Sequence, residues 1–242
     1  MRIGIIAAME EEIKALREML VKRTVESSGH FEFFKGELMG HEVILLLCGI
    51  GKVNAAVGTT LLIERYAPQG IINTGVAGGF PPDLIRLGDI VIATEARHHD
   101  ADATVFDYEY GQIPRMPAAY ETDPYLRERA LENIPETLTV RVHTGQILSG
   151  DSFVHARQQI RSIRERFPSI LAVEMEGAAI AQTCYLFSTP FLLIRSISDL
   201  VMEQESKHIY ELSVEASAEN SVQLVLSLLK ALHEEASPSF AI

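Results

Sequence analysis

The sequence predicts an α/β fold, a three-layer αβα sandwich with a mixed, mostly parallel central sheet. Two observations predict it. Short apolar runs alternate with amphipathic stretches along the chain, and no internal repeat or linker-like tract interrupts them. Such alternation is typical of a sheet that is covered by helices on both faces. A chain of 242 residues, 47% hydrophobic and 22% charged, fits one large domain, which we assign to residues 1–242.

The N-terminal part of the chain shows the patterns of a strand, a helix and a hairpin. RIGIIAA (2–8) is a short apolar run suited to a buried strand, and EEIKALREML (11–20) follows the period of an amphipathic helix. FEFFKGEL (31–38) and EVILLLC (42–48) flank the tripeptide MGH. This arrangement predicts two paired strands joined by a tight turn.

The next stretch contains a helix and two further strands. GIGKVNAAVGTTLLIERY (49–66) begins with a glycine turn and continues as a helix, and Pro68 follows its end. GIINTG (70–75) predicts a buried strand, VAGGFPP (76–82) a loop, and DIVIATEAR (89–97) another strand. The order continues the alternation expected of a sheet between helices.

The remainder of the chain begins with an irregular segment. Residues 100–123 show no clear period and are rich in aromatic residues and proline, so we expect a long loop. Helices and strands then alternate again. We expect helices near 124–133, 156–167, 177–187 and 206–233, and strands near 139–148, 170–176 and 190–198.

The charge and hydropathy of the chain disfavour several kinds of partner. A formal net charge of −12 argues against binding to nucleic acid or to an anionic membrane. No apolar run approaches the roughly 18 residues that span a bilayer. Three glutamates interrupt the apolar start, so we expect no signal peptide. Cys48 and Cys184 lie in apolar surroundings, which favours reduced core residues of a cytoplasmic protein.

Most of the unusual chemistry follows the predicted strands. In sheets of this kind, ligands bind beyond the carboxyl ends of the strands, where the loops leave the sheet. The chain has no GxGxxG after its first strand, no GxxxxGK[ST] and no GxSxG, so common nucleotide and esterase motifs are absent. Carboxylates beside apolar runs, glycine clusters and an SGD turn lie at 9–12, 49–52, 74–79, 149–154, 174–176 and 196–199.

VEMEGAA (173–179) places two carboxylates, Glu174 and Glu176, in an otherwise apolar stretch. Burying a carboxylate without a partner is costly. The two are therefore either satisfied structural ions or acceptors for a ligand that supplies hydroxyl groups. In an extended segment both would share one face, with Met175 on the other, and one of them would be structural.

Two further carboxylates have a structural alternative. Glu10, Glu11 and Glu12 open a helix, where acidic side chains interact favourably with the helix dipole. Glu12 could equally point back over the ends of the strands. Asp199 closes FLLIRSISD, in which an ion pair with Arg195 is the alternative to a functional carboxyl group.

The cluster ARHHDAD (96–102) invites a metal hypothesis through His98, His99, Asp100 and Asp102. It lacks the spacing of motifs such as HExxH. Strand alternation would also direct these side chains to different faces. We therefore expect no metal site.

The chain carries nine motifs that follow one another in the order seen in a known family: AAMEEE, CGIGKVNAA, INTGVAGG, GDIV, HHDAD, FDYEYGQIP, SGDSF, AVEMEGAA and RSISD. It resembles the bacterial 5′-methylthioadenosine/S-adenosylhomocysteine nucleosidases, of the purine nucleoside phosphorylase superfamily, from residue 1 to about residue 230. The resemblance implies a nucleoside phosphorylase-like fold, a homodimer, and no metal or cofactor. It implies irreversible hydrolysis of an N-glycosidic bond to adenine and a 5-thio-substituted ribose, in methionine salvage and recycling of S-adenosylmethionine by-products.

The resemblance assigns the chemistry to three carboxylates. Glu176 would accept hydrogen bonds from the ribosyl hydroxyls and attract the oxocarbenium-like cation that forms during cleavage. Asp199 would protonate N7 of adenine, which requires that burial or nearby negative charge raise its pKa. Glu12 would be the general base that orients and deprotonates the attacking water. Glu174 would belong to the surrounding structural shell.

The resemblance also implies the walls of the pocket. Phe153 would lie against adenine, the backbone of Val154 would read the edge of the base, and Met175 would pack against the sugar. Aromatic residues are more often packing residues, but those in loops favour recognition. In the family, part of the wall around the 5′-thio substituent comes from the other subunit. The implied substrate-binding residues are Met9, Ile50, Ala77, Gly78, Phe153, Val154, Met175, Glu176, Arg195, Phe106, Tyr108, Pro114 and Tyr210.

Two departures from the family pattern leave alternatives open. Val76 stands where most relatives carry serine, and valine also occurs in members that act on 6-amino-6-deoxyfutalosine. HIYEL (208–212) replaces an SFDEF-like segment, so that Tyr210 would cover the purine. The preference among methylthioadenosine, S-adenosylhomocysteine, 5′-deoxyadenosine and aminodeoxyfutalosine, the last in menaquinone synthesis, therefore stays open.

Two other functions compete with hydrolysis. A purine nucleoside phosphorylase would need an anion site for phosphate, and a noncatalytic nucleoside-binding module would need neither Glu12 nor Asp199. The sequence MEEE after the first strand would repel phosphate, which favours hydrolysis.

Overall fold

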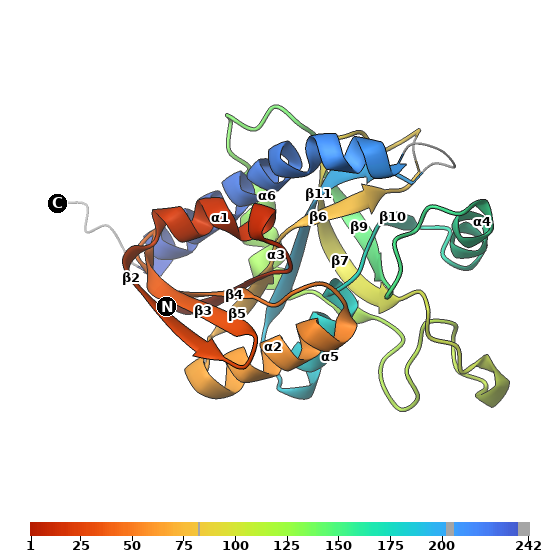
Figure 1. Cartoon of the computed structure of the whole chain (residues 1–242), viewed down its shortest axis with the longest axis horizontal. Coiled ribbons are helices and arrows are strands. Elements are labelled where there is room, and N and C mark those ends of the chain that lie inside the picture. The colour runs from red at the N-terminus through yellow and green to blue at the C-terminus, as the bar shows by residue number, and fades with distance from the viewer. Residues whose placement is uncertain (82, 202–205, 237–242) are drawn as a thin grey trace.

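The computed structural model describes residues 1–81, 83–201 and 206–236, and it places a mixed sheet between helices (Figure 1). The strands are β1 (Arg2–Ala7), β2 (Val21–Ser28), β3 (Phe31–Leu38), β4 (His41–Leu47), β5 (Gly70–Asn73), β6 (Val76–Gly79), β7 (Ile90–His98), β8 (Tyr120–Glu121), β9 (Val142–Ser149), β10 (Ile170–Glu174) and β11 (Phe191–Leu200). The helices are α1 (Glu10–Met19), α2 (Lys52–Tyr66), α3 (Pro124–Glu132), α4 (Arg157–Arg166), α5 (Gly177–Leu186) and α6 (Ser206–Ala236), and a 3₁₀ turn lies at Thr104–Phe106. Across the described ranges, none of the helices has the length and apolar character needed to cross a membrane.

The strands follow the order β2-β3-β4-β1-β5-β11-β6-β10-β9-β7-β8, and β11 also pairs with β7. Parallel pairing joins β1 to β4 and β5, β11 to β5 and β6, and β9 to β7 and β10. Antiparallel pairing joins β3 to β2 and β4, β10 to β6, and β7 to β8 and β11. The extra pairing closes β6, β10, β9, β7 and β11 into a ring. The predicted mixed sheet is confirmed, and one half of it is curled.

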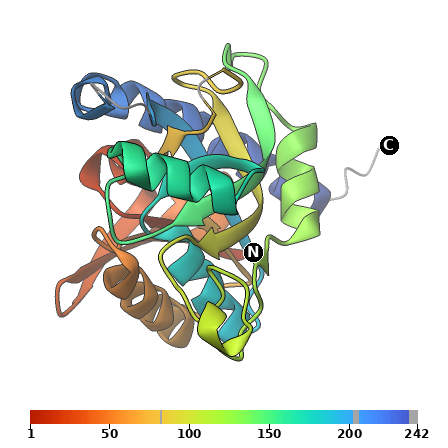
Figure 2. The same ribbon diagram turned by 90° about the vertical axis from the view of Figure 1, so that its right-hand side faces the viewer.

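Successive residues of β1 point into two different apolar cores, as strand geometry requires. Ile5 packs in the core that includes Leu16 of α1 and Leu228 of α6, while Ile6 packs in the core that includes Leu62 of α2. Figure 1 accordingly shows α1 and α6 on one side of the sheet and α2 and α5 on the other. A third apolar cluster holds α4 against β9 and β10, and Figure 2 shows this helix on the side that faces the viewer. The helices cover the faces of the sheet and leave open the carboxyl ends of β1, β10 and β11.

Most predicted elements are present, but three strands, β2, β6 and the two-residue β8, were not predicted. β2 has the sequence VKRTVESS, and nearly all of its side chains are exposed, so no apolar alternation marks it. Its order comes from backbone pairing with β3. β6 lies where the sequence predicted a loop, because VAGG forms its ladder only through contacts with β10 and β11, which are distant in sequence. The long segment after β7 is largely irregular, as expected, and includes the two-residue strand β8.

Candidate active site

A cavity of about 280 Å³ lies at the carboxyl ends of β1, β10 and β11. This is the edge at which the sequence predicted a ligand site. Segments that are far apart along the chain meet there, and they bring four carboxyl groups into one cavity. The lining consists of Ala8, Met9, Glu12, Ile50, Val76, Ala77, Gly78, Phe153, Val173, Glu174, Met175, Glu176, Ser198, Asp199 and Tyr210.

Glu12 lies in the first turn of α1, and its buried side chain points back over the ends of the strands. Its Oε2 accepts hydrogen bonds from the backbone N–H groups of Ala8 (2.9 Å) and Met9 (3.0 Å). Its Oε1 accepts one from the N–H of Val76 (2.9 Å). A Cβ added at Gly75 would overlap the carboxylate, so glycine permits this close approach. Two loops therefore hold the carboxylate in one orientation.

The environment of Glu12 opposes its negative charge. Burial raises the pKa of Glu12 above its ordinary value, although the Arg195 charge and the three backbone hydrogen bonds act in the other direction. A carboxylate with a raised pKa is a stronger base than an exposed one. Position and basicity therefore both suit proton abstraction from a molecule in the cavity.

Glu174 is held by a buried hydrogen-bond network. Its Oε2 accepts hydrogen bonds from Nη2 of Arg195 (2.6 Å) and from the backbone N–H of Gly177 (2.7 Å). The Ser149 hydroxyl donates to its other oxygen, and the Arg195 Nη2 also donates to Asn73 (2.8 Å). With its acceptors taken by the protein, Glu174 serves the structure of the site, as the sequence interpretation proposed.

Asp199 is only 2% exposed, and it is not the ion-pair partner that the structural alternative required. That alternative is wrong, because Arg195 pairs with Glu174. A shift in the pairing of β11 with β6 lies between Ile197 and Asp199. The Ser198 hydroxyl donates to Oδ1 of Asp199 (3.1 Å). Burial raises the pKa of Asp199 to about 6, and the hydrogen bond from Ser198 opposes this shift.

Glu176 lies at the N-cap of α5, beyond the end of β10. Its backbone is not extended (φ −128°, ψ −38°), so the predicted sharing of one strand face with Glu174 is wrong. Both carboxyl groups nevertheless line the cavity. The N–H of Gly51 donates to Oε1 of Glu176 (2.7 Å). Burial and the negative charge of Glu174 raise the pKa of Glu176, while Arg195 and the Gly51 N–H oppose the shift.

An aromatic and sulfur wall forms another part of the cavity. The rings of Phe153 and Tyr210 meet edge to face, with their centroids 6.0 Å apart. The Tyr210 hydroxyl contacts Sδ of Met9 at 3.2 Å. Phe153 and Ile50 are partly exposed at the mouth. This wall offers flat and polarisable surfaces to a planar or sulfur-bearing ligand.

Five sequence-predicted residues lie outside the lining. Val154 is buried in the apolar cluster beside α4, and Arg195 is buried against its carboxylate partner. Phe106 is 72% exposed. Together with Tyr108 and Pro114 it belongs to the segment between β7 and β8, which projects from the rest of the chain (Figure 1).

The cavity also includes residues that the sequence interpretation did not select. Ala8 and Val173 carry no chemical signal that separates them from ordinary core residues. Ser198 adjoins Asp199 in the RSISD motif, and a hydroxyl next to a candidate acid was a usable signal. Val76, noted as a departure from the family pattern, lines the cavity beside Glu12.

Three of the four residues of the metal hypothesis, His98, Asp100 and Asp102, have hydrogen-bond partners within the protein, whereas Nε2 of His99 is buried without one among the described residues. Nε2 of His98 lies 3.0 Å from Oε1 of Gln182, and Oδ1 of Asp100 accepts a hydrogen bond from Nζ of Lys52 (2.6 Å). Asp102 accepts hydrogen bonds from the turn that follows it. In the part of the chain that the structure describes, no three His, Cys, Asp or Glu side chains are placed to hold a metal ion.

Comparison with known proteins identifies close relatives. Residues 2–233 match the family described as the phosphorylase superfamily. The 5′-methylthioadenosine/S-adenosylhomocysteine nucleosidase of Maridesulfovibrio salexigens is 57% identical over 96% of this chain and 100% of its own, and that of Bacillus subtilis is 48% identical with the same coverage. The structure of the Neisseria meningitidis nucleosidase of this name, in complex with methylthio-immucillin-A, gives a TM-score of 0.92 at 43% identity, covering 95% of this chain and 99% of the other. The nucleosidase from Colwellia psychrerythraea, in complex with adenine, gives 0.93 at 42% identity over 96% of each chain.

Proposed function

The chain belongs to the phosphorylase superfamily and, within it, to the 5′-methylthioadenosine/S-adenosylhomocysteine nucleosidases, and on that basis we propose how its site works. It hydrolyses the N-glycosidic bond of these two nucleosides to adenine and a 5-thio-substituted ribose. The observation that carries the mechanism is the cavity in which Glu12, Glu176 and Asp199 meet.

Asp199 is the general acid in this proposal. Adenine leaves readily only when N7 takes a proton as the C1′–N9 bond breaks. An exposed aspartate is ionised near neutral pH, but the pKa of Asp199 is raised to about 6. Asp199 therefore retains a proton closer to neutral pH than an exposed aspartate does.

Glu12 is the general base. A water molecule between Glu12 and the sugar adds its oxygen to C1′ and gives a proton to the Glu12 carboxylate. The electron pair of the C1′–N9 bond passes to adenine, which receives the proton from Asp199. The three backbone hydrogen bonds that hold Glu12 keep its carboxylate oriented, so little reorganisation is needed during the reaction.

Glu176 binds the ribosyl hydroxyls and stabilises the cation. In the free protein, burial and Glu174 raise its pKa. Hydrogen bonds from two sugar hydroxyls favour the charged form and so bring the carboxylate to full charge when the nucleoside binds. That charge attracts the oxocarbenium-like ribosyl group as it forms.

The charge of the cavity supports water rather than phosphate as the nucleophile. Glu12, Glu174, Glu176 and Asp199 all line it. The guanidinium of Arg195 is already paired with Glu174. A phosphate ion would meet carboxylates where a phosphorylase needs cations and hydroxyl groups.

The protein acts as a cytoplasmic homodimer in this proposal, through an apolar face on α2 and α5. The two helices pack against each other, and they leave Val53, Val57, Tyr185 and Leu186 exposed. Ile50, at the mouth of the cavity, directly precedes α2. A partner docked on this face would bring its projecting segment, with Phe106, Tyr108 and Pro114, toward the cavity of the first subunit.

Turnover in phosphate-free buffer tests the function. We expect adenine and free 5-methylthioribose from 5′-methylthioadenosine, at a rate that added phosphate does not change. The same assay with S-adenosylhomocysteine, 5′-deoxyadenosine and aminodeoxyfutalosine would rank the substrates. A sugar 1-phosphate as product would make the protein a phosphorylase, and binding without adenine release would make it a nucleoside-binding module.

A further inference from the structure

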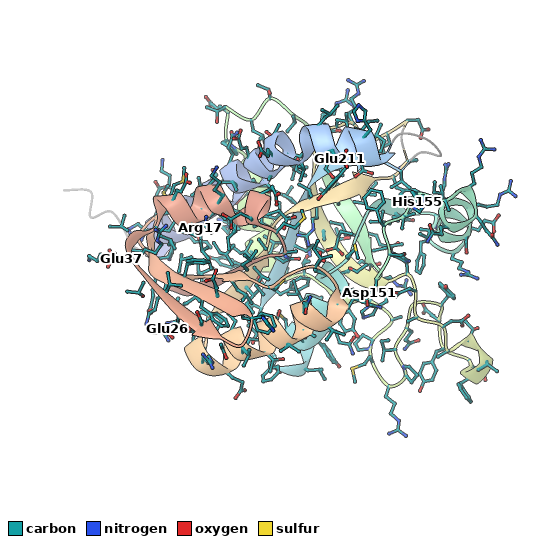
Figure 3. The ribbon with its side chains drawn as sticks, in the orientation of Figure 1. Arg17, Glu26, Glu37, Asp151, His155 and Glu211 are labelled. Atoms are coloured by element: carbon teal, nitrogen blue, oxygen red, sulfur yellow. The ribbon has the colours of Figure 1, made fainter. Side chains whose placement is uncertain are left out.

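Three hydrogen bonds connect the start of α2, the loop after β7 and the loop after β9 with one another. The backbone N–H of Lys52 donates to Oδ1 of Asp151 (2.8 Å), and Nζ of Lys52 donates to Oδ1 of Asp100 (2.6 Å). The backbone N–H of Asp151 donates to Oδ2 of Asp100 (3.0 Å). We call these three residues the Asp100 clip. Figure 3 labels Asp151 beside the ribbon of α2.

The clip lies between segments that carry parts of the nucleoside cavity. Ile50 and Gly51 directly precede Lys52, and Gly51 gives its N–H to Glu176. Phe153 lies two residues after Asp151. Neither Asp100 nor Asp151 lines the cavity. The clip therefore connects the segments of two cavity residues, Ile50 and Phe153, and it does not itself line the cavity.

The backbone around the clip is shaped for close contact. Gly51 has φ +97°, and an added Cβ there would lie 3.2 Å from Oδ1 of Asp151. A Cβ at Gly150 would overlap the ring of His99, so the loops that hold Asp100 and Asp151 pack directly on each other. Glycine at these two positions permits both approaches.

The demands on the two carboxylates differ. Asp100 uses both of its oxygens, each for a different donor, whereas Asp151 accepts the Lys52 N–H with one oxygen. An asparagine has a single carbonyl oxygen, and its NH₂ group cannot accept a hydrogen bond. Asparagine can therefore replace the function of Asp151 but not that of Asp100.

We propose that Asp100 and Asp151 are positioning residues for the nucleoside site. They fix the loop of Phe153 to the start of α2. This contact determines the position of Ile50 and keeps the Gly51 N–H within hydrogen-bond distance of Glu176. The inference rests on the proposed function, because it concerns the same site. Asp100, which was first considered as a metal ligand, is thereby assigned a positioning role.

Steady-state kinetics with 5′-methylthioadenosine test the proposal. Asp100→Asn should raise KM about tenfold, the effect of losing one hydrogen bond to a charged group, while kcat falls by less than about threefold. Asp151→Ala should behave in the same way, and Asp151→Asn should stay near the wild-type KM. Lys52→Met, which removes only the ammonium contact, should give a smaller rise of about threefold in KM.

Asp102→Asn is the matched control. Asp102 lies on the same loop and accepts hydrogen bonds from Thr104, but it has no contact with the clip. Its variant should keep the wild-type KM and kcat. Melting curves of all variants separate a loss of folding from a loss of positioning. If Asp100→Asn does not fold, Lys52→Met takes its place as the variant that tests the clip.

Two results would overturn the inference. One is an Asp100→Asn protein with a lowered melting temperature and an unchanged KM, and the other is equal KM values for Asp151→Ala and Asp151→Asn. A wild-type protein that releases no adenine would instead refute the proposed function. In that case the dissociation constant of adenine, measured by calorimetry on the same variants, should still follow the order predicted for KM.

Discussion

At the scale of single residues, Asp199 shows how the burial of a carboxyl group, here the proposed general acid, conflicts with stability. The structure buries it without a cation, and its pKa is raised as a result. The sequence could place Asp199 in the RSISD motif, but it could not show which carboxylate Arg195 binds. That choice depends on how β10 and β11 come together around β6, which only the folded sheet decides.

Asp199→Asn should make the protein more stable at neutral pH while it removes activity. A carboxyl group with a folded pKa of about 6 and an ordinary value of 3.8 stabilises the fold below pH 3.8, and this contribution is lost as the pH rises through 6. The loss amounts to at most about 3 kcal/mol. The melting temperature of the variant should therefore exceed that of the wild type increasingly from about pH 4 to pH 6, and by a constant amount above pH 6.

The activity of the same variant separates proton donation from structure. An amide cannot transfer a proton to N7, so turnover of adenine nucleosides should fall by about 10²–10⁴-fold. A p-nitrophenyl riboside that fits the site releases p-nitrophenolate, which departs without protonation, so the variant should lose far less rate on this substrate. Equal losses on both substrates, together with a less stable protein, would remove Asp199 from the mechanism.

Ser198→Ala should shift the pH dependence of the enzyme. The Ser198 hydroxyl lowers the pKa of Asp199, so its removal should raise that pKa further. Because the acid must be protonated, kcat/KM falls as the pH rises through its pKa, and this basic limb should move to higher pH. Ser196→Ala is the control, since the Ser196 hydroxyl on the same strand donates to the carbonyl of Gly88 (3.1 Å). An unmoved basic limb in Ser198→Ala would count against Asp199 as the titrating acid.

At the scale of elements, the site depends on how the turn after β5 meets α1. Gly75 lies in this turn, and it leaves the space in which Glu12 reaches the N–H of Val76. The sequence marked the glycine cluster as a ligand-binding loop. The structure shows that this glycine instead makes room for a side chain of the protein.

Gly75→Ala should reduce activity through Glu12. The added Cβ would displace the carboxylate from its three donors, and a general base that is out of place loses about 10²-fold in rate. KM should change less than kcat, because the role proposed for Glu12 is to act on the attacking water. Gly70→Ala, at the start of β5, is the control, since its Cβ would meet Leu126 at an ordinary 3.5 Å. Full activity in Gly75→Ala would show that Glu12 tolerates displacement.

The elements also show what a sequence pattern can predict. Helices and buried strands with a clear period were predicted to within a few residues, because the spacing of their apolar residues indicates which face is buried. β2 and β6 lack that signal, since one is exposed and the other is half glycine. The loops of the site were predicted because they follow strands. The clip between Asp100 and Asp151 was not, because it joins two loops across the fold.

At the scale of the whole molecule, the cavity is open on the side of Ile50 and Phe153. Three residues that the family resemblance places in its wall lie instead on a projecting segment of the same chain. The apolar face on α2 and α5 begins next to Ile50. An open cavity, a projecting segment and an apolar face together support a dimer that completes each site.

Val53→Glu should separate the subunits of the proposed dimer and lower the activity of each subunit. Val53 is 73% exposed on α2, and a glutamate buried in an apolar interface would lose its hydration without gaining a partner. We expect a monomer by light scattering and a KM for 5′-methylthioadenosine raised by roughly tenfold or more, because the partner's contacts to the 5′-substituent disappear. Val25→Glu is the control, because Val25 is 52% exposed on strand β2, outside the apolar face on α2 and α5. This variant should leave both the oligomeric state and KM unchanged. A Val53→Glu protein that is monomeric and has the wild-type KM would show that one chain forms the whole site by itself.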